Sequence, residues 1–295
     1  MKKILVVFLI TIFFVACSDE KQRELYQPTG TVINKKVYVV GIHPYLNSKK
    51  MYSSYRPILD YLEKHLENIS FVLETSSDYA AYNVKLYRSD FHFSLPNPFQ
   101  TYNALKYNYK VIAKMKPDQV FRGIFVARKD SQLTNVMQLK NKAVSFPAPT
   151  ALAATMMPLY YLHEHGLDVN NIEKKYVGSQ YSSILNAYSS DTIAGATWPP
   201  PWESWSKENP DKAKEMEVVW QTEPLINNGF VVRADVDEKL AQDLAKLLSE
   251  LDNTKHGKEM LSNAGFAGFE YSKNKDYDIV EKFLEKYDKA IGIPK

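Results

Sequence analysis

The sequence has a single cysteine, Cys17, so the chain cannot form an internal disulfide. Its stability must therefore come from a packed hydrophobic core, and 45% of the 295 residues are hydrophobic. The formal net charge is only +3, and the basic residues form no cluster interleaved with aromatic side chains, which argues against a nucleic-acid-binding protein. Aromatic residues, by contrast, are plentiful, with 20 Tyr, 14 Phe and 4 Trp, as suits a protein that lines a cleft with rings.

Patterns typical of enzymes and metalloproteins are also missing from the sequence. There is no His-x-x-x-His pair and no carboxylate-rich loop, and His163 and His165 lie two positions apart on a predicted helix, so they point to different sides. There is no Gly-x-Ser-x-Gly elbow and no glycine-rich phosphate loop. Ser179 has no base nearby in the sequence and is expected to cap a helix. We therefore expect no catalytic residue, no metal and no cofactor.

The chain up to Cys17 has the pattern of a bacterial export signal. Two lysines precede an apolar stretch, residues 4–15, that is too short for a permanent transmembrane helix. Residues 14–17 (FVAC) resemble a lipobox, in which the cysteine is lipidated and becomes the mature N-terminus. We therefore predict a lipoprotein that Cys17 anchors at the periplasmic face of a membrane. An ordinary secretory signal with a chance cysteine is the alternative interpretation.

Beyond a polar segment, strand and helix signals alternate along the chain. Short apolar runs that end at turn residues predict buried strands, and apolar residues at helical spacing predict amphipathic helices. The predicted strands are 37–42, 69–73, 91–94, 111–115, 121–128, 142–146, 175–177, 193–196, 217–220 and 230–233. The predicted helices are 55–66, 78–87, 151–165, 182–188, 236–251, 257–264 and 278–291.

This alternation forms two series and predicts a two-lobed α/β protein. Each lobe is expected to be a mixed, mostly parallel sheet flanked by helices, with a ligand cleft between the lobes. We expect a monomer. The predicted order is a lipoprotein signal peptide (1–17), a flexible tether (18–36), the first part of lobe 1 (37–120), lobe 2 (121–221), and a return to lobe 1 with the C-terminal helices (222–295).

The turns that follow the strands are the candidate binding site, because ligands of open α/β sheets lie at the carboxyl ends of the strands. Four such turns are residues 43–48, 94–99, 147–155 and 178–182. A helix that begins in a turn leaves backbone N–H groups unpaired and carries a partial positive charge, which suits an oxyanion. Each turn alone is more typical of an ordinary capped helix, and it is the convergence of four turns on one predicted cleft that indicates a site. The candidate residues are Tyr45, Asn97, Phe99, Thr150, Ala151, Leu152, Ala153, Ser179 and Gln180.

The stretch from Trp198 to Trp205 (WPPPWESW) is the most unusual in the chain. Its three prolines predict a rigid, extended segment. Trp198 and Trp202 either line the pocket or pack on the second lobe, and packing is favoured for Trp205. Arg122 either pairs with an anionic ligand or forms a salt bridge at the surface or hinge.

The ordered set of segments resembles the periplasmic substrate-binding proteins of the phosphate, phosphite and phosphonate uptake class. The resemblance covers roughly residues 37–264 and implies the type II periplasmic-binding-protein fold. The matching stretches are residues 121–131 (FRGIFVARKDS), 138–146 (QLKNKAVSF), 176–184 (YVGSQYSSI) and 195–197 (GAT).

Three positions depart from that class. The phosphonate binders carry a Ser/Thr-rich turn where this chain has residues 150–155 (TALAAT), and a His where it has Gln180. The acid that holds a ligand amine is replaced within residues 225–228 (LINN). An anion contacted by backbone amides still fits this pattern, whereas an aminophosphonate, which needs carboxylates around its ammonium group, is disfavoured.

The resemblance implies an extracytoplasmic binding lipoprotein that closes on a small oxyanion of the phosphonate, phosphite or phosphate kind and delivers it to an ABC importer. Closure requires that the ligand bind the closed state better than the open state. The alternative is a receptor that presents its closed form to a sensor histidine kinase or a chemoreceptor. An adhesion or scaffold lipoprotein with a vestigial cleft is a third possibility.

Overall fold

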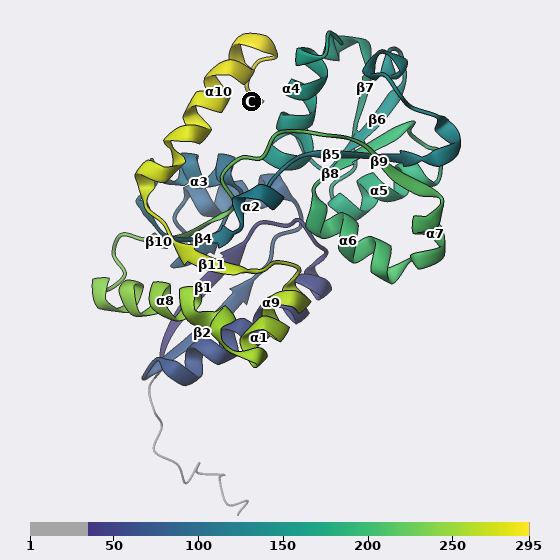
Figure 1. Cartoon of the computed structure of the whole chain (residues 1–295). Coiled ribbons are helices and arrows are strands. Elements are labelled where there is room, and N and C mark those ends of the chain that lie inside the picture. Colours follow the sequence, from purple (N-terminus) through teal and green to yellow (C-terminus); the bar gives the residue numbers. More distant parts are fainter. Residues whose placement is uncertain (1–34, 295) are drawn as a thin grey trace, which may run out of the picture. The chain divides into compact units, whose positions relative to one another are not determined.

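The computed structural model describes residues 35–294, and their strands form two sheets of six and five strands flanked by helices (Figure 1). The predicted signal peptide (1–17), the predicted lipid-attachment residue Cys17 and nearly all of the predicted tether lie outside these residues. Within residues 35–294, no helix combines the length and the apolar character needed to cross a lipid bilayer.

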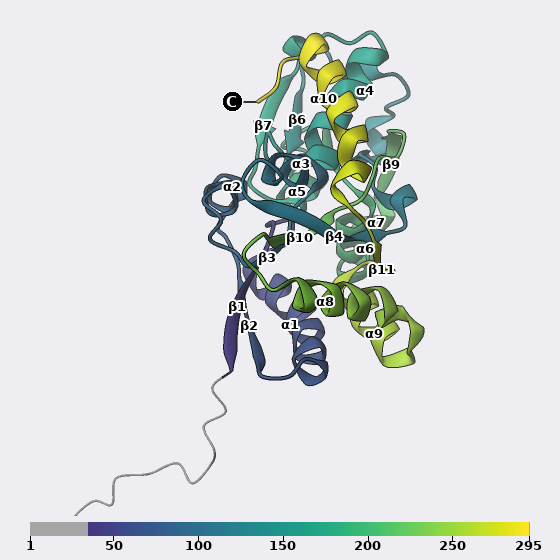
Figure 2. The ribbon, with the colours of Figure 1, turned by 90° about the vertical axis from the view of Figure 1, so that its left-hand side faces the viewer.

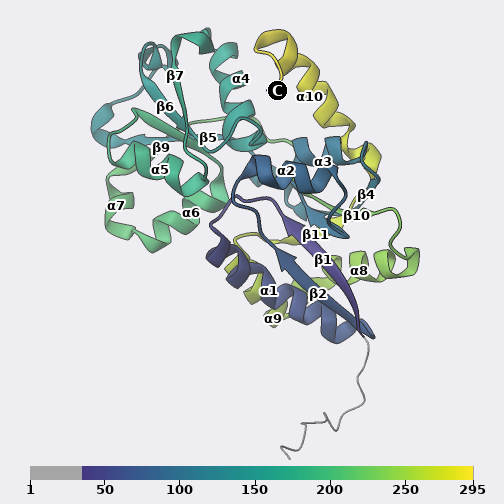
Figure 3. The ribbon, with the colours of Figure 1, turned by 180° about the vertical axis from the view of Figure 1, so that it is seen from behind.

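The six-stranded sheet and its helices form what we call lobe 1. Its strands are β1 (Lys36–Ile42), β2 (Ile69–Glu74), β3 (Phe93–Leu95), β4 (Tyr109–Lys116), β10 (Gly229–Arg233) and β11 (Gly268–Tyr271). Its helices are α1 (Ser48–His65), α2 (Tyr79–Tyr87), α3 (Pro98–Ala104), α8 (Glu238–Glu250) and α9 (Lys255–Ala264). The strand order is β11-β4-β10-β3-β1-β2. Helices α1, α8 and α9 cover one face of this sheet, and α2 and α3 cover the other (Figures 2 and 3).

The five-stranded sheet and its helices form what we call lobe 2. Its strands are β5 (Ile124–Arg128), β6 (Ala143–Phe146), β7 (Glu173–Tyr176), β8 (Ala194–Thr197) and β9 (Met216–Gln221), in the order β7-β6-β8-β5-β9. A π-helical turn (Leu152–Met156) leads directly into α4 (Met157–Glu164). The other helices are α5 (Gln180–Tyr188), α6 (Pro199–Glu208) and the short α7 (Pro210–Lys214).

Three parts of the chain connect the lobes. The segments between β4 and β5 and between β9 and β10 carry the chain out of the first sheet and back into it. The last helix, α10 (Asp278–Ala290), runs beside α3 and α4 (Figure 1). Its Glu281 accepts a hydrogen bond from the Tyr102 hydroxyl of α3 at 2.6 Å, and its Phe283 ring lies edge-on to Tyr160 of α4, with the ring centroids 5.6 Å apart. Helix α10 therefore packs on both lobes.

The predicted strands and helices all occur, with shifted ends. Helix α1 begins at Ser48, seven residues before the predicted start at residue 55, because the Asn47 side chain caps it by accepting from the Lys50 N–H. Helices α3, α6 and α7 and strand β11 were not predicted.

The predicted extended conformation of residues 199–201 is wrong. These three prolines form the first turn of α6. The first turn of a helix tolerates proline, because its N–H groups have no intrahelical acceptor and the proline φ already suits a helix. The backbone conformation that favours an extended proline run is therefore also compatible with a helix start.

The expectation of mixed sheets is confirmed, but parallel pairs do not predominate. Among the described strands, β1 pairs in parallel with β2 and β3, and β6 with β7 and β8. The other five pairings are antiparallel. All five involve β4 or β5 or the returning strand β10, because each of these strands lies next to a crossing between the sheets.

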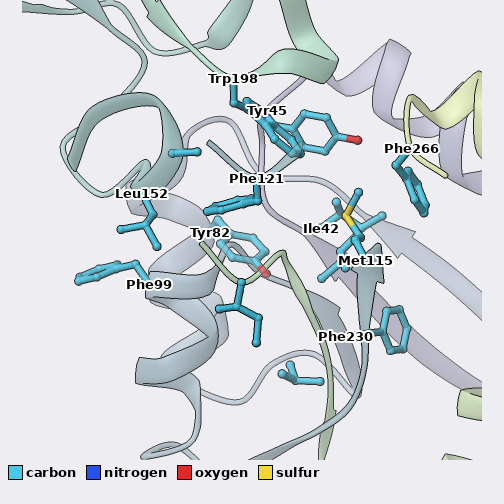
Figure 4. Close-up of a cluster of buried hydrophobic side chains, with 14 of the residues drawn as sticks. Ile42, Tyr45, Tyr82, Phe99, Met115, Phe121, Leu152, Trp198, Phe230 and Phe266 are labelled. Atoms are coloured by element: carbon cyan, nitrogen blue, oxygen red, sulfur yellow. The ribbon is translucent and has the colours of Figure 1, made fainter. Parts of the chain in front are cut away.

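Much of the core is aromatic, in keeping with the composition. In lobe 1, Tyr82 stacks on Phe91 with the centroids 5.5 Å apart, and Phe93 stacks on Phe230 at 6.2 Å. Phe121, on the segment that leads from β4 to β5, lies against Trp198 where the lobes meet (Figure 4). Hydrophobic packing is thus continuous from one lobe into the other.

Gly41 provides a test of this packing. A Cβ atom at this position would lie 2.6 Å from three atoms of the Phe91 ring, which is fully buried and stacked on Tyr82. We expect Gly41→Ala to lower the free energy of unfolding by about 1–3 kcal/mol, measured by urea denaturation, because overpacking forces side chains off their preferred rotamers. Adding Phe91→Leu should restore part of the loss. An unchanged midpoint for the single variant would contradict this account.

Candidate functional site

The carboxyl ends of strands from both lobes face one another, and side chains meet there. The Asn97 amide of lobe 1 donates to the Thr150 carbonyl oxygen of lobe 2, with Nδ2 and O 3.1 Å apart. The Gln180 amide of lobe 2 donates to the Tyr79 hydroxyl of lobe 1, with Nε2 and Oη 3.3 Å apart. The lobes are thus in a closed arrangement. We call the residues that meet here the interlobe site: His43, Tyr45, Tyr79, Asn97, residues 150–155, Gln180, Thr197 and Trp198.

The start of the π-helical turn presents three unpaired backbone N–H groups. Among the described residues, no side chain caps this turn and no carbonyl accepts from the N–H groups of Leu152, Ala153 and Ala154. These residues are only 1%, 5% and 1% exposed. Buried backbone N–H groups are almost always paired, so an uncapped helix start of this kind is suited to an external acceptor such as an oxyanion. The buried Thr155 hydroxyl, in the same turn, also has no partner among these residues.

Hydrogen bonds to the sheet hold the start of α5 close to this turn. The Ser183 hydroxyl oxygen lies within hydrogen-bond distance of the carbonyl oxygens of Ser145 on β6 (2.9 Å) and Ala196 on β8 (2.8 Å), which share its single O–H donor. Helix α5 lies so close to β8 that a Cβ atom on Gly195 would be 2.3 Å from the Ser183 carbonyl oxygen. Gln180, the first residue of α5, accepts from the Thr197 hydroxyl through Oε1 at 2.9 Å. This bond orients the amide so that Nε2 points to Tyr79 in lobe 1.

The start of α6 differs from the other two helix starts in lobe 2. Its first three positions are prolines, which have no backbone N–H group, so this helix start has no free donor for a ligand. The preceding residue, Trp198, is 2% exposed and lies between Tyr45 and Phe121, with ring centroids at 5.8 and 5.6 Å. This helix start therefore contributes aromatic and apolar surface in place of donors.

The other predicted site residues lie around this centre or outside it. Phe99 lies on α3, and the side chain of Leu152 points toward it from lobe 2 (Figure 4). Ser179 caps α5 by accepting from the Ser182 N–H, as expected. Trp202 stacks on Trp205 within lobe 2, with the centroids 5.6 Å apart. Arg122 lies on the segment between the lobes, where its Nε donates to the Gln119 carbonyl oxygen at 2.9 Å.

Sequence reasoning missed His43, Tyr79 and Thr197. His43 is the first residue of the predicted turn 43–48, in which Tyr45 is the only predicted site residue. Thr197 ends β8 and is fully buried. Nothing local distinguishes Tyr79, because its role comes from the contact with Gln180, about a hundred residues away in the sequence.

A cleft of about 730 Å³ opens beside the interlobe site, between α6 of lobe 2 and α9 with the start of α1 in lobe 1. Tyr45 belongs to its wall, as do the three prolines of α6. Lys50 and Glu208 line it from opposite lobes and form an ion pair, with Nζ and Oε1 2.7 Å apart. Within residues 35–294, no group of three or more His, Cys, Asp or Glu side chains is arranged to hold a metal ion.

The sequence pattern of the family described as "ABC transporter, phosphonate, periplasmic substrate-binding protein" matches residues 40–277. The chain belongs to this family. By that description its members are periplasmic substrate-binding proteins of ABC transporters, so they act outside the cytoplasm.

Relatives of known structure share the fold. The binding protein component of an ABC phosphonate transporter from Pseudomonas aeruginosa superimposes with a TM-score of 0.79 at 15% identity, over 87% of this chain and 88% of that one. PhnD1 from Prochlorococcus marinus (MIT 9301), solved in complex with methylphosphonate, superimposes with a TM-score of 0.79 at 23% identity. The superposition covers 86% of this chain and 99% of that one. The type II periplasmic-binding-protein fold is therefore confirmed.

A curated relative of known name is also similar in sequence. The Prochlorococcus marinus protein named "Probable ABC transporter phosphite binding protein PhnD1" is 25% identical over 196 residues. The match covers 62% of this chain and 66% of the relative.

For a binding protein of this family, the Lys50–Glu208 pair links the two lobes in the closed state. Burial raises the pKa of Glu208, but the hydrogen bond and charge of Lys50 outweigh it, so the pKa of Glu208 is lowered. The hydrogen bond to Glu208 likewise raises the pKa of Lys50 above its ordinary value. The pair is therefore ionised throughout the neutral range. Its contribution to closure is present above the ordinary pKa of a glutamate and is lost as the pH falls through the lowered pKa of Glu208.

We expect Lys50→Ala to shift the protein modestly toward the open state. Both side chains are more than a third exposed, and such pairs contribute about 0.2–1 kcal/mol, so ligand affinity should fall no more than about fivefold. Fluorescence transfer between dyes on the two lobes would report opening, and high salt should abolish the difference from wild type. Lys49→Ala, at the exposed neighbouring position, is the matched control. An equal effect of both substitutions would contradict a specific link.

Proposed function

We propose that this protein is a lipid-anchored, monomeric binding component of an ABC importer, and that it closes on a small oxyanion of the phosphonate or phosphite kind. The observation that carries the proposal is the set of buried, unpaired N–H groups at Leu152, Ala153 and Ala154, opposite lobe 1. The names of the relatives support this ligand class, since PhnD1 is named a probable phosphite binding protein and its structure was solved in complex with methylphosphonate.

Closure follows from donors that lie on different lobes. The backbone N–H groups of residues 152–154 belong to lobe 2, whereas the Asn97 amide and the Tyr79 hydroxyl belong to lobe 1. An oxyanion between them accepts from both lobes only when the lobes are together. Its affinity for the closed state therefore exceeds its affinity for the open state, and binding shifts the population toward closure.

The interlobe site favours an oxyanion without an attached ammonium group. None of its residues is an aspartate or a glutamate. An aminophosphonate would bury its ammonium group without a carboxylate partner, which is costly. Methylphosphonate and phosphite are the probes that suit the site best.

A ligand screen with a matched pair of variants tests the binding site. We expect methylphosphonate or phosphite, at about 100 times its dissociation constant, to stabilise the wild type by roughly 2.7 kcal/mol and raise its melting temperature by several degrees. Ala153→Pro removes one N–H donor at the second position of the helical turn. It should weaken binding roughly 10- to 150-fold, as expected for the loss of one hydrogen bond to a charged group.

Lys239→Pro is the control for a proline in a helix start, because it occupies the second position of α8, far from the site and 80% exposed at its side chain. It should leave ligand affinity unchanged. Leu152→Pro, one position earlier, repeats the test if Ala153→Pro does not fold. Wild-type affinity in both site variants would place the anion elsewhere, and no stabilisation by any oxyanion would refute the proposed ligand class.

Transport and sensing are separated by a growth assay. Deletion of the gene should abolish growth on the bound oxyanion as the sole phosphorus source if the protein serves an importer. Unchanged growth together with a lost transcriptional or chemotactic response to the same oxyanion would instead identify the alternative, a receptor for a sensor kinase or chemoreceptor.

The lipid anchor is tested at Cys17. We expect Cys17→Ser to move the protein from the membrane fraction to the soluble fraction, because lipid attachment requires the cysteine thiol. Fractionation followed by immunoblotting measures this. Lys2→Gln, which leaves the cysteine in place, should stay with the membrane. Membrane association of the Cys17→Ser protein would show that another feature anchors the chain.

A further inference from the structure

We propose that His43 acts as a hydrogen-bond acceptor in the interlobe site and makes it select singly ionised oxyanions that still carry an O–H group. Phosphonates and phosphite in their monoanionic form meet this requirement, whereas sulfonates and fully ionised phosphonates do not. This inference rests on the proposed function and specifies the form of the ligand that the site takes.

The placement of His43 puts its ring at the meeting point of the lobes. It directly follows β1 and is 3% exposed. Its ring stacks on Tyr45, with the centroids 5.0 Å apart, and lies edge-on to Tyr79 at 6.1 Å. Both tyrosines contact lobe 2, Tyr45 through Trp198 and Tyr79 through Gln180. A ligand held between the lobes therefore lies close to this ring.

The tautomer of His43 follows from its single hydrogen bond. Nδ1 lies 2.9 Å from the carbonyl oxygen of Leu95, the last residue of β3. A carbonyl oxygen only accepts, so Nδ1 must carry the proton and Nε2 of the neutral ring is left as an acceptor. Nε2 makes no hydrogen bond within the described part of the chain. The site thus contains one unpartnered acceptor beside several unpartnered donors.

The surroundings keep this ring neutral. Burial lowers the pKa of His43 to about 4, despite the hydrogen bond to Leu95. The titratable groups that face the ring are Tyr45, from the same turn, and Tyr79 and Tyr82, from α2. Burial raises the pKa of each of these hydroxyls, so none is charged near neutral pH. His43 therefore remains an acceptor over the whole range in which phosphonates lose their second proton.

The charge balance of the site points the same way. None of the residues of the interlobe site is a lysine or an arginine. Arg122 donates to Gln119 on the connecting segment, and Lys50 pairs with Glu208 at the neighbouring cleft. Neutral donors and helix starts stabilise one negative charge on a bound ligand. A second negative charge on the ligand would be buried without a positively charged partner. A monoanion with one proton left satisfies both the donors and the His43 acceptor.

The test compares two ligands of nearly the same shape. Methylphosphonate carries an O–H as a monoanion, whereas methanesulfonate is a monoanion without one. We expect wild-type protein below the second pKa of methylphosphonate to bind it at least tenfold more tightly than methanesulfonate. Above that pKa, the dissociation constant should rise about tenfold per pH unit, because only the protonated fraction binds. Isothermal titration calorimetry from about pH 5.5 to about pH 9 measures both effects.

His43→Phe keeps an aromatic ring against Tyr45 and removes the acceptor. We expect this variant to bind methylphosphonate at least tenfold more weakly and to lose the discrimination against methanesulfonate, with little change in methanesulfonate affinity. If it does not fold, the wild-type pH profile decides alone. Methylphosphonate affinity that stays constant or improves above the second pKa would overturn the role of His43, as would equal wild-type affinity for methanesulfonate, while the proposed oxyanion function would stand. Binding of neither ligand, nor of phosphite, would overturn both.

Discussion

The proposed binding chemistry depends on one feature, the unpaired N–H groups of Leu152, Ala153 and Ala154. A helix start normally satisfies its first N–H groups with a capping side chain or with water. Here no side chain among the described residues caps the turn, and its residues are buried. The alanines contribute to this directly. Because their side chains end at Cβ, the backbone itself forms the binding surface, and the donors keep their geometry without the entropy cost of ordering long side chains.

The rest of lobe 2 holds these donors in place. The Ser145–Ser183 hydrogen bonds and the close approach at Gly195 fix α5 to the sheet, and the Thr197–Gln180 bond fixes the amide that reaches across to lobe 1. The prolines of α6 remove a third set of donors, and Trp198 fills the adjacent space. The result is an asymmetric site, with donors on one side and rings on the other. Such a site orients a ligand that has an oxyanion head and a small apolar substituent.

Much of this arrangement could be predicted from the sequence, for identifiable reasons. Strands such as 37–42 are short apolar runs between turn residues, and topology places the ends of such strands at a binding cleft. The turn at residues 150–155 is predicted in this way, and the structure has an uncapped helix start there. Helix α3 was missed because Pro96, Asn97 and Pro98 resemble a loop, although Asn97 caps the helix and Pro98 occupies its first position. Helix α6 was missed for the same reason, since proline favours both an extended segment and a helix start.

The side chains of the site depended on information that the local sequence does not hold. Tyr79 follows an ordinary helix cap, and only folding brings it to Gln180. The acceptor character of His43 depends on Leu95, on a strand more than fifty residues away, and on burial by three tyrosines. Backbone donors can be anticipated from a strand–turn–helix pattern, because the pattern itself creates them. Side-chain acceptors cannot, since their protonation is set by neighbours that only the tertiary structure provides. The specificity of a binding protein built on neutral donors must therefore come from such acceptors, and in this chain the proposed acceptor that distinguishes one oxyanion from another is His43.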